Sequence, residues 1–338
     1  MSIVITRTPF RISFFGGGSD YPEWLHREPG AVLSTAIDKY VYLTCRYLPP
    51  FLGIRHRVVW RHVELIDSIS EILHPAVREG LRYLEFDDSR GIELHYQGDL
   101  PARSGMGSSS SFAVGLIQAL LCLRGRNADK HKLAEMAIEL EQNRMKDTVG
   151  SQDQVAVAHG GLNIIRFNCG GTFDVNALGL PEAREHELLQ RLMLFFPGRS
   201  RIASEVACSV TQNLVKRSDS IRHMVAMVEE GEKILRGGDL DDFGRLLHES
   251  WLIKRSLSNR VSSPQIDDLY AAARQAGAIG GKLLGAGGTG FVLLYAPPER
   301  RKAISSALQG CIDVPFAIDH DGSCIIYQAD GAQNYPWH

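Results

Sequence analysis

Cysteine is scarce in this sequence of 338 residues. The six cysteines are widely scattered, with no CxxC pair and no Cys/His group at the spacing of a zinc site. They are typical of reduced thiols that fill the core of a cytosolic protein. The N-terminal residues alternate like a strand and lack the basic region, apolar run and cleavage site of a signal peptide. We therefore expect a cytoplasmic protein.

An excess of one charge and long apolar runs are also missing. The formal net charge is −2, which gives no overall field that would attract nucleic acid or an anionic membrane. No uncharged apolar stretch reaches the roughly 18 residues that a membrane span requires. We predict neither a nucleic-acid partner nor a membrane association, and an anionic substrate must be met by a local basic cluster.

The two halves of the sequence differ in pattern. The first half mixes strand-like alternation, as in Tyr40–Tyr47, with helical patterns at Phe112–Leu123 and Asp129–Lys146. The other expected elements are strands at Arg57–Trp60, Ile92–Gln97, Leu162–Phe167, Leu192–Phe196, Gly290–Tyr295 and Ile318–Tyr327, and helices at Ala203–Leu235, Asp241–Ser256 and Pro264–Gln275. Partly segregated strand and helix runs favour an α+β fold. We predict two domains that share a cleft, residues 1–185 and 186–338.

The strongest local signal is the run PARSGMGSSSS from Pro101 to Ser111, which is followed at once by an apolar helix pattern. A helix start leaves backbone N–H groups unpaired and carries a partial positive charge, so it suits an anion. Gly105 and Gly107 would let the loop curl around a phosphate, and the serine hydroxyls could ligate a phosphate-bound Mg²⁺. A glycine turn with a capping serine is the simpler interpretation, but four serines exceed what capping requires. No lysine follows the glycines, so this is not a Walker A loop, and basic residues elsewhere must help Mg²⁺ to neutralise a triphosphate.

Two further glycine clusters carry weaker signals. Gly285–Gly290, GAGGTG, formally matches a dinucleotide-binding loop, but it precedes a strand pattern and does not open a helix. A tight turn packed against another backbone, such as that of the first loop, is favoured there. In Pro9–Pro22, PFRISFFGGGSDYP, Arg11 lies in an otherwise apolar strand, where it is either half of a structural ion pair or functional. Asp20 is a turn residue or a substrate ligand.

Together, the three segments resemble the motifs of the GHMP kinase superfamily (galactokinase and homoserine, mevalonate and phosphomevalonate kinases). PFRISFFGGGSDY is similar to the first motif, LPARSGMGSSSSFAVG to the second and KLLGAGGTGFVLL to the third, in the same order. The resemblance covers essentially the whole chain. It implies a two-domain α+β fold with ATP and substrate in the interdomain cleft. Within the superfamily, FRISFFGGGSDYPEW, GSQDQVAVAHGGLN and PGRSRIASEV are most similar to bacterial D-glycero-D-manno-heptose 7-phosphate kinases.

The resemblance assigns roles to individual residues. Asp153 matches the catalytic aspartate, and Arg11 matches the arginine that galactokinases pair with it, which would keep Asp153 ionised and add positive charge near the transferred phosphoryl group. Ser109 and Glu141 match the Mg²⁺ ligands, with Ser108 as the alternative if the register slips by one. The implied ATP-binding residues are Pro101, Ser104, Gly105, Met106, Gly107, Ser108, Ser109 and Ser110.

The acceptor site departs from the galactokinase pattern. Gly17 and Gly18 stand where galactokinases have an acidic residue and a histidine, while Asp20 is kept. Loss of a carboxylate opens space for a sugar that carries a phosphate beyond C6, in agreement with a heptose 7-phosphate. We expect a basic group from Arg199, Arg201, Lys254 or Arg255 to bind that phosphate. The expected substrate-binding residues are Gly17, Gly18, Ser19, Asp20, Arg199, Arg201, Lys254, Gly287 and Gly288.

The resulting hypothesis is an ATP-dependent kinase that phosphorylates the anomeric hydroxyl of a heptose 7-phosphate, on the route to nucleotide-activated heptose for surface polysaccharide. Three alternatives remain: a kinase for a galactose- or fucose-like sugar, a catalytically silent sensor that binds sugar and ATP, and a metabolite decarboxylase of the same superfamily. Retention of Arg11, Asp153, Ser109 and Glu141 together disfavours the sensor. The expected partners are small molecules, and a homodimer is left open.

Overall fold

The computed structural model describes residues 3–198, 217–288 and 290–329. The strands are β1 (Ile3–Phe15), β2 (Gly30–Tyr47), β3 (His56–Val59), β4 (Val63–Ile66), β5 (Ile92–Gly98), β6 (Leu162–Phe167), β7 (Phe173–Ala177), β8 (Leu192–Phe196), β9 (Gly280–Leu283), β10 (Val292–Tyr295), β11 (Ile312–Asp313) and β12 (Cys324–Ala329). The α-helices are α1 (Pro22–Leu25), α2 (Pro75–Tyr83), α3 (Ser108–Leu123), α4 (Lys130–Ile138), α5 (Gln152–His159), α6 (Glu182–Arg191), α8 (Ser218–Gly237), α9 (Leu240–Leu257), α10 (Pro264–Gln275) and α11 (Arg301–Ala307). Short 3₁₀ or π turns occupy η1 (Pro50–Leu52), η2 (Ile69–Glu71), η3 (Glu139–Arg144) and η4 (Pro298–Arg300).

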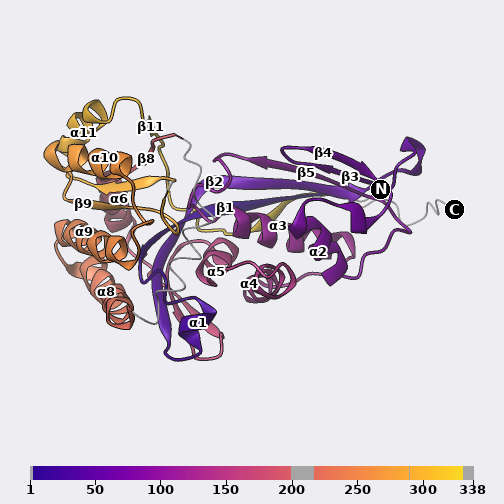
Figure 1. The fold of residues 1–338 in the computed structure, drawn as a ribbon, viewed down its shortest axis with the longest axis horizontal. Coiled ribbons are helices and arrows are strands. Elements are labelled where there is room, and N and C mark those ends of the chain that lie inside the picture. Colours follow the sequence, from indigo (N-terminus) through magenta and orange to yellow (C-terminus); the bar gives the residue numbers. More distant parts are fainter. Residues whose placement is uncertain (1–2, 199–216, 289, 330–338) are drawn as a thin grey trace.

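The described residues form two lobes, each built on one sheet (Figure 1). The larger lobe has eight strands in the order β12-β1-β2-β5-β3-β4, with β6 paired to β2 and β7 paired to β6. Helices α2, α3, α4 and α5 lie along one side of this sheet (Figure 1). The smaller lobe has four strands in the order β11-β8-β10-β9, with helices around them. This is the predicted α+β fold with two lobes.

The long hairpin of β1 and β2 is the centre of the larger sheet. These strands pair from Ile3 opposite Arg46 to Phe15 opposite Leu33. The second half of β2 also pairs with β5, and its first half pairs with β6. Helix α3 packs on both strands and is buried along almost its whole length, which explains why its sequence is apolar on nearly every face.

The lobes are joined by an aromatic cluster at the end of β1. The rings of Phe14 and Phe15 each meet Phe243 of α9 edge-on, with centroids 5.3 and 5.1 Å apart. All three side chains are fully buried. On α8, Gly231 leaves room for the Phe15 ring, because a Cβ there would lie 2.9 Å from it. Helices α8 and α9 of the smaller lobe are therefore packed against β1, the strand that also carries Arg11.

Most local predictions are confirmed. In β2, Val41, Leu43 and Cys45 are buried while the residues between them are half-buried, as their alternation predicts. The side chain of Asp129 caps α4 by accepting from the Lys132 amide. The helix predicted over Asp129–Lys146 is α-helical only to Ile138 and continues as the π turn η3.

One prediction lies partly outside the described residues, and two differ from the structure. The helix expected from Ala203 is described only as α8, because residues 203–216 lie outside the described residues. The strand expected from Ile318 begins at Cys324, and Ile318 itself makes a single bridge to Ile37. The predicted boundary between residues 185 and 186 lies inside α6, and β12, which was assigned to the second domain, pairs with β1 in the larger sheet.

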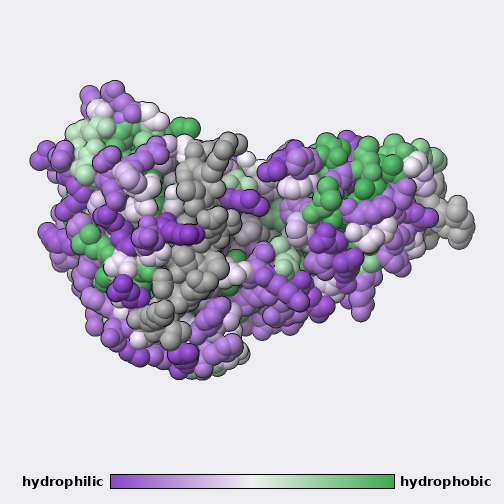
Figure 2. Space-filling model, in the orientation of Figure 1, coloured by the Kyte–Doolittle hydropathy of each residue, from purple (hydrophilic) through white to green (hydrophobic). Residues whose placement is uncertain are grey.

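The surface is largely polar, with apolar residues gathered at the end of the larger lobe that carries β3, β4 and β5 (Figure 2). The exposed large apolar side chains there include Phe51, Leu52, Val63, Leu65 and Leu73. Among the described helices, none is long and apolar enough to cross a membrane.

Candidate active site

A cavity of about 580 Å³ lies where the lobes meet. Its walls come from β1 and the loop after it, the serine-rich loop and start of α3, residues 146–150, the start of α5, helices α8 and α9, and the end of β9 with the loop that follows. The predicted residues that line it are Arg11, Gly17, Gly18, Asp20, Gly105, Gly107, Ser108, Ser109, Ser110, Asp153 and Lys254. The three motifs, which lie far apart in the sequence, therefore meet at one site.

The serine-rich loop forms the start of α3 as predicted. Gly105 and Gly107 have left-handed backbone conformations, with φ of 80° and 78°, and α3 begins at Ser108 directly after Gly107. The Ser108 hydroxyl accepts a hydrogen bond from the Arg103 amide. The backbone groups of this tight turn are exposed to the cavity at a helix start, which is the arrangement that suits a phosphate.

The third glycine loop packs directly against the first, as the sequence analysis proposed. The Phe291 amide donates to the Ser104 carbonyl at 3.1 Å, and a Cβ on Gly105 would lie 2.6 Å from the Leu284 carbonyl oxygen. Gly285 and Ala286 line the cavity. Gly287 and Gly288 instead lie against Val261 and outside the cavity wall, so their predicted contact with substrate gains no support.

Arg11 and Asp153 form a bidentate ion pair at the centre of the cavity. Arg11 Nε donates to Asp153 Oδ1 at 2.7 Å, and Nη2 donates to Oδ2 at 2.6 Å. Arg11 Nη1 also donates to the Gly105 carbonyl at 2.7 Å, which ties the pair to the serine-rich loop. The Arg11 side chain is buried, whereas that of Asp153 is 23% exposed to the cavity. The structural interpretation of Arg11 as half of an ion pair is confirmed, and its functional role stays a prediction, although both partners line the cavity.

Asp20 is part of a hydrogen-bonded network beside this pair. Its carboxylate accepts from the Gly18 amide at 3.0 Å and from the amide and side chain of Gln152 at 3.1 and 3.0 Å. Burial, with a smaller contribution from the nearby Asp153 carboxylate, raises the pKa of Asp20. Gly150 is required here, since a Cβ would lie 1.9 Å from Asp20 Oδ2. Ser19 is fully buried and holds the turn to Gly16 and Ala31, outside the cavity wall.

Glu141 lies in the π turn η3 and faces the serines of α3. Its Oε2 accepts from the Ser110 hydroxyl at 2.8 Å and from Gln154 Nε2 at 2.6 Å. Burial raises the pKa of Glu141 to about 7, although hydrogen bonds from Ser110, Ser109 and Gln154 oppose the shift. Its Oε1 is buried and has no partner among the described residues. A buried carboxylate oxygen without a partner, beside a serine hydroxyl, fits a ligand of Mg²⁺.

Two lysines, the buried Lys282 and the half-buried Lys254, face the cavity from the smaller lobe. Lys254 of α9 donates to the Leu283 carbonyl at 2.8 Å and to that of Gly285, and Lys282 of β9 donates to the Phe14 carbonyl at 2.7 Å. Burial lowers the pKa of both, with repulsion from Arg11 adding to it, and the pKa of Lys282 falls to about 7. Within the described part of the chain, neither lysine has a carboxylate partner.

Sequence reasoning did not find Lys282, which lies three residues before Gly285. Nor did it find Ser110 as the direct partner of Glu141, or Gln152 and the exposed cations Arg103 and Lys146, all of which line the cavity. Arg103 and Lys146 are two of only three described non-glycine residues with left-handed backbones, at φ of 58° and 59°. Strained conformations of this kind cluster at functional sites.

Some predicted residues lie elsewhere. Met106 is fully buried, and its carbonyl accepts from the Arg11 amide; Pro101 and Ser104 are likewise not part of the cavity wall. Arg255 pairs with Asp267 at 2.8 Å and does not line the cavity, so it is not placed to bind a substrate phosphate. Arg199 and Arg201 lie outside the described residues. Among the described residues, no group of three His, Cys, Asp or Glu side chains is placed to hold a metal ion.

The chain matches two family models. GHMP kinases N terminal domain matches residues 71–161, and GHMP kinases C terminal matches residues 231–312, together just over half of the chain. The N-terminal match includes the serine-rich loop, Glu141 and Asp153, and the C-terminal match includes Lys254, Lys282 and the third glycine loop.

Relatives with recorded activities are similar over most of this chain. The D-glycero-alpha-D-manno-heptose 7-phosphate kinase of Campylobacter jejuni is 26% identical over 332 residues, which cover 91% of this chain and 94% of that protein. The Arabidopsis thaliana bifunctional fucokinase/GDP-fucose pyrophosphorylase is 27% identical over 94% of this chain, but this spans 32% of that protein. The galactokinase of Pyrococcus furiosus is 24% identical over 91% of this chain and 93% of its own.

Solved structures share the fold at lower identity. A D-glycero-D-manno-heptose 1-phosphate kinase from Bacteroides thetaiotaomicron superposes with a TM-score of 0.78 at 22% identity, over 98% of this chain and 100% of that one. The galactose complex of Lactococcus lactis galactokinase gives a TM-score of 0.71 at 17% identity, over 96% of this chain and 94% of that one. Identities at this level show the fold alone.

Proposed function

The chain belongs to the GHMP kinase family, and from that premise we propose that it transfers the terminal phosphoryl group of ATP to the anomeric hydroxyl of D-glycero-D-manno-heptose 7-phosphate. The proposed product is the 1,7-bisphosphate, a precursor of nucleotide-activated heptose for surface polysaccharide. The observation that carries the proposal is the Arg11–Asp153 ion pair, which lies beside the serine-rich loop in a cavity that is also lined by two lysines with no carboxylate partner among the described residues.

The proposed mechanism is mainly positioning and charge compensation, as phosphoryl transfer requires. The start of α3 and its serines would hold the phosphates of ATP. Each Asp153 oxygen accepts one hydrogen bond from Arg11, which leaves lone pairs for the sugar hydroxyl. Asp153 would orient that hydroxyl and receive its proton, while Arg11 stays beside the charge that develops on the transferred group.

Ser109 and Glu141 are the residues that would hold Mg²⁺ in this proposal, with Ser110 positioning the Glu141 carboxylate. A cation held by these residues would supply positive charge that neutralises part of the charge of the phosphates. Glu141 must be deprotonated to ligate a cation, and the pKa of about 7 means that a bound cation would shift it toward the ionised form. The proposed function therefore includes Mg²⁺, held by Ser109 and Glu141.

Lys254 and Lys282 support a phosphorylated acceptor. A buried ammonium group without a carboxylate partner is costly, and an anionic ligand would remove that cost. Gly17 and Gly18 also line the cavity and leave room for the sugar, since a Cβ on Gly17 would meet nothing closer than 3.7 Å. We assign the 7-phosphate to these two lysines, which replaces the predicted role of Arg255.

The testing experiment compares heptose 7-phosphate with free heptose as acceptors, measuring ADP release and locating the new phosphate by ³¹P NMR. The proposal predicts efficient turnover of heptose 7-phosphate and an anomeric phosphate in the product. Equal kcat/KM for the free sugar would contradict the phosphate pocket. Turnover of only a galactose- or fucose-like sugar would support the alternative kinase, and ATP binding without turnover of any sugar would support the silent sensor.

Lys282→Met and Lys254→Met test the acceptor pocket, and Arg255→Met is the matched control on α9. Loss of a charged hydrogen bond to phosphate predicts that KM for the sugar phosphate rises about tenfold or more in each lysine variant, with little change in KM for ATP. Arg255→Met, whose partner is Asp267, should keep both KM values. Unchanged acceptor KM in both lysine variants would contradict this assignment without affecting the kinase activity itself.

A further inference from the structure

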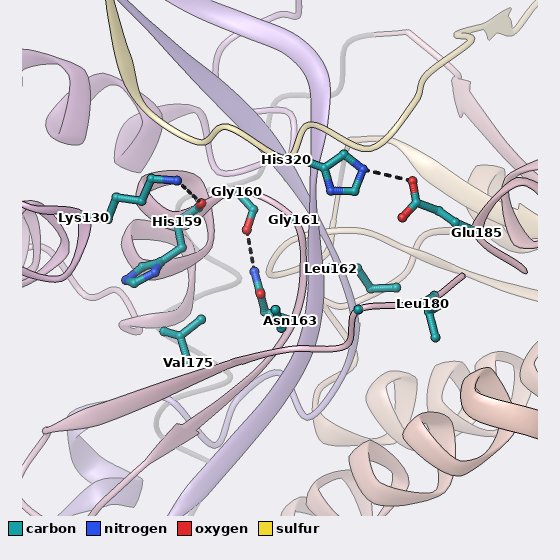
Figure 3. Close-up of a pocket in the computed structure, with 12 residues that line it drawn as sticks. Lys130, His159, Gly160, Gly161, Leu162, Asn163, Val175, Leu180, Glu185 and His320 are labelled. Carbon is teal, nitrogen blue, oxygen red and sulfur yellow. Dashed lines mark hydrogen bonds and ion pairs between the residues drawn. The ribbon is translucent and has the colours of Figure 1, made fainter. Parts of the chain in front are cut away.

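A second cavity of about 500 Å³, shown in Figure 3, includes His159 at the end of α5, whereas Asp153 at the start of α5 lines the cleft. Helix α5 carries Asp153 in its first turn and ends at His159, which lines the second cavity. No residue lines both cavities. The volume is within the range of about 300–1,000 Å³ that is usual for small-molecule sites. Neither the motifs nor the proposed function uses this cavity.

One end of the cavity is cationic. Lys130, the first residue of α4, donates one hydrogen bond to the His159 carbonyl at 2.9 Å, so two of its three N–H donors remain for a ligand. The Nε2 atom of His159 is buried and has no partner among the described residues. Burial, with repulsion from His131 and Lys130, lowers the pKa of His159 to about 4. The imidazole is therefore neutral near pH 7, and the positive charge at this end belongs to Lys130.

The other end is anionic and comes from a different part of the chain. Glu185 of α6 lies across the cavity from Lys130, with its Oε1 paired to His320 Nε2 at 3.1 Å (Figure 3). Glu185 Oε2 has no hydrogen-bond partner among the described residues, and that oxygen is left to accept from a ligand. Between the two ends, Asn163 donates to the Gly160 carbonyl at 2.6 Å, which leaves its side-chain oxygen as a further acceptor.

These groups specify the chemistry of an occupant. An ammonium at one end requires an anionic group, and a carboxylate and an amide oxygen further along require hydrogen-bond donors such as hydroxyls. Apolar side chains from Leu162, Val175 and Leu180 complete the wall and suit the C–H faces of a sugar or polyol. We propose that this cavity binds a small anionic polyol, a sugar phosphate or a sugar acid, and that its occupant regulates catalysis through α5.

Helix α5 is a short, rigid connection between the two cavities. It has eight residues, a length of about 12 Å, and Gln154 to Ala158 are buried against the helices and strands around them. Its last turn is fixed by the Lys130 contact and by Gly160, where a Cβ would lie 2.2 Å from the Gly322 amide. An anion that draws Lys130 away from the His159 carbonyl would therefore act on the end of the helix whose first turn holds Asp153.

Calorimetric titration tests the site with four probes: glucose 6-phosphate, gluconate, glucose and inorganic phosphate. The variants are Lys130→Met and Glu185→Gln. Their matched controls are Lys132→Met, whose partner Glu135 lies on the surface, and Glu182→Gln in the first turn of the same helix. None of these four residues lines the cleft, so binding of a probe in the active site would be equal in all of them.

We expect glucose 6-phosphate or gluconate to bind the wild type and both controls, and Lys130→Met to weaken that binding about tenfold or more, as loss of a charged hydrogen bond predicts. The bound probe should change kcat at saturating substrates in the wild type and in Lys132→Met. Lys130→Met lacks the same contact with the His159 carbonyl, so its kcat without probe should already be shifted in the same direction and should not respond further to the probe. Binding that is equal in all variants, absent from the wild type, or as strong for glucose or inorganic phosphate would overturn the proposal. Bound probe with no change in kcat would overturn its regulatory part. A failure of the kinase assay itself would leave the binding result intact, so the two proposals fail separately.

Discussion

Single residues in the cleft compensate for the lysine that the serine-rich loop lacks. Arg103 precedes the loop glycines and Lys146 follows the π turn that carries Glu141, and both line the cavity. Each has a left-handed backbone, which costs about 1–3 kcal/mol for a residue other than glycine. The side chains of both are exposed to solvent in the ligand-free protein. We infer that they are the cations that face the triphosphate.

Arg103→Gly and Lys146→Gly test this role, because glycine accepts the same backbone angle while it removes the charge. We expect KM for ATP to rise about tenfold in each variant, with no loss of thermal stability. Glu85→Gly is the matched control, since Glu85 is the third described non-glycine residue with a left-handed backbone, at φ of 58°, and does not line the cavity. Unchanged KM for ATP in both cationic variants would exclude them from the nucleotide site.

The lowered pKa of the buried Lys282 predicts that binding of the sugar phosphate takes up a proton, by an amount that depends on pH. Its pKa of about 7 means that the ligand-free side chain is mostly neutral at pH 8, and a bound phosphate would restore the charge. Binding of the sugar phosphate should therefore take up about one proton at pH 8 and almost none at pH 6. Calorimetry in buffers of different ionisation enthalpy measures this number. The uptake should disappear in Lys282→Met, and the same uptake in that variant would assign it to another group.

The lowered pKa of Lys282 also makes the stability of the protein depend on pH. A lysine with a depressed pKa in the folded state contributes stability above its unfolded pKa, and that contribution is lost as the pH falls through the folded pKa of about 7. In the ligand-free protein, this group therefore makes the free energy of unfolding rise between pH 7 and pH 10.5. The difference between wild type and Lys282→Met across that range isolates its contribution from those of other groups.

At the scale of elements, the site is held together by the contact between the segment before α5, which carries Gly150, and the loop after β1, which carries Asp20. Gly150 separates the π turn from α5 and lies against Asp20, at a position where a Cβ would approach to 1.9 Å. Gly150→Ala should displace the Asp20–Gln152 network. We expect a marked fall in kcat together with only a small fall in Tm. Gly125→Ala is the control variant, because a Cβ added at Gly125 would have no neighbour within 4 Å. The φ of Gly125 is 67°, so alanine there adds some backbone strain but no clash. Equal kcat in Gly150→Ala and wild type would show that the network does not position Asp153.

The elements also show what the sequence could predict. The apolar helix α3 and the alternating strand β2 were found because their patterns are local and repeat at 3.6 and 2 residues. The pairing of Arg11 with Asp153 was implied by the resemblance to galactokinases, and the structure shows the ion pair. Lys282 was missed because a lysine beside a glycine turn has no local signal, and only the packing of β9 against the end of β1 makes it buried and part of the site.

At the scale of the whole molecule, the two lobes do not correspond to two consecutive parts of the sequence. The final strand β12 returns to the larger sheet, and Thr8 of β1 shares a buried hydrogen bond with Ser323 at 2.7 Å. No local pattern distinguishes a strand that pairs with its neighbour in sequence from one that pairs with residues 300 positions away. This is why the predicted range 186–338 includes a strand of the first lobe.

Truncation after Gly322 tests this arrangement against truncation after Ala329, which keeps β12. The shorter protein should lose about 5–10 °C in Tm, the effect of a few kcal/mol on a protein of this size. Hydrogen exchange should show the loss of protection in Ile3–Arg7 of β1, the residues that pair with β12. Loss of protection confined to the smaller lobe would contradict the assignment of β12.

The central claim is that the cleft is a kinase active site in which Asp153 acts on the acceptor hydroxyl while the serine-rich loop holds ATP. Its most direct test is ADP release by Asp153→Asn, measured together with ATP affinity. The account predicts that kcat falls by at least about a hundredfold, the usual contribution of a positioned acid or base, while ATP binds with little change. Turnover near that of the wild type would remove Asp153 from catalysis and contradict the account.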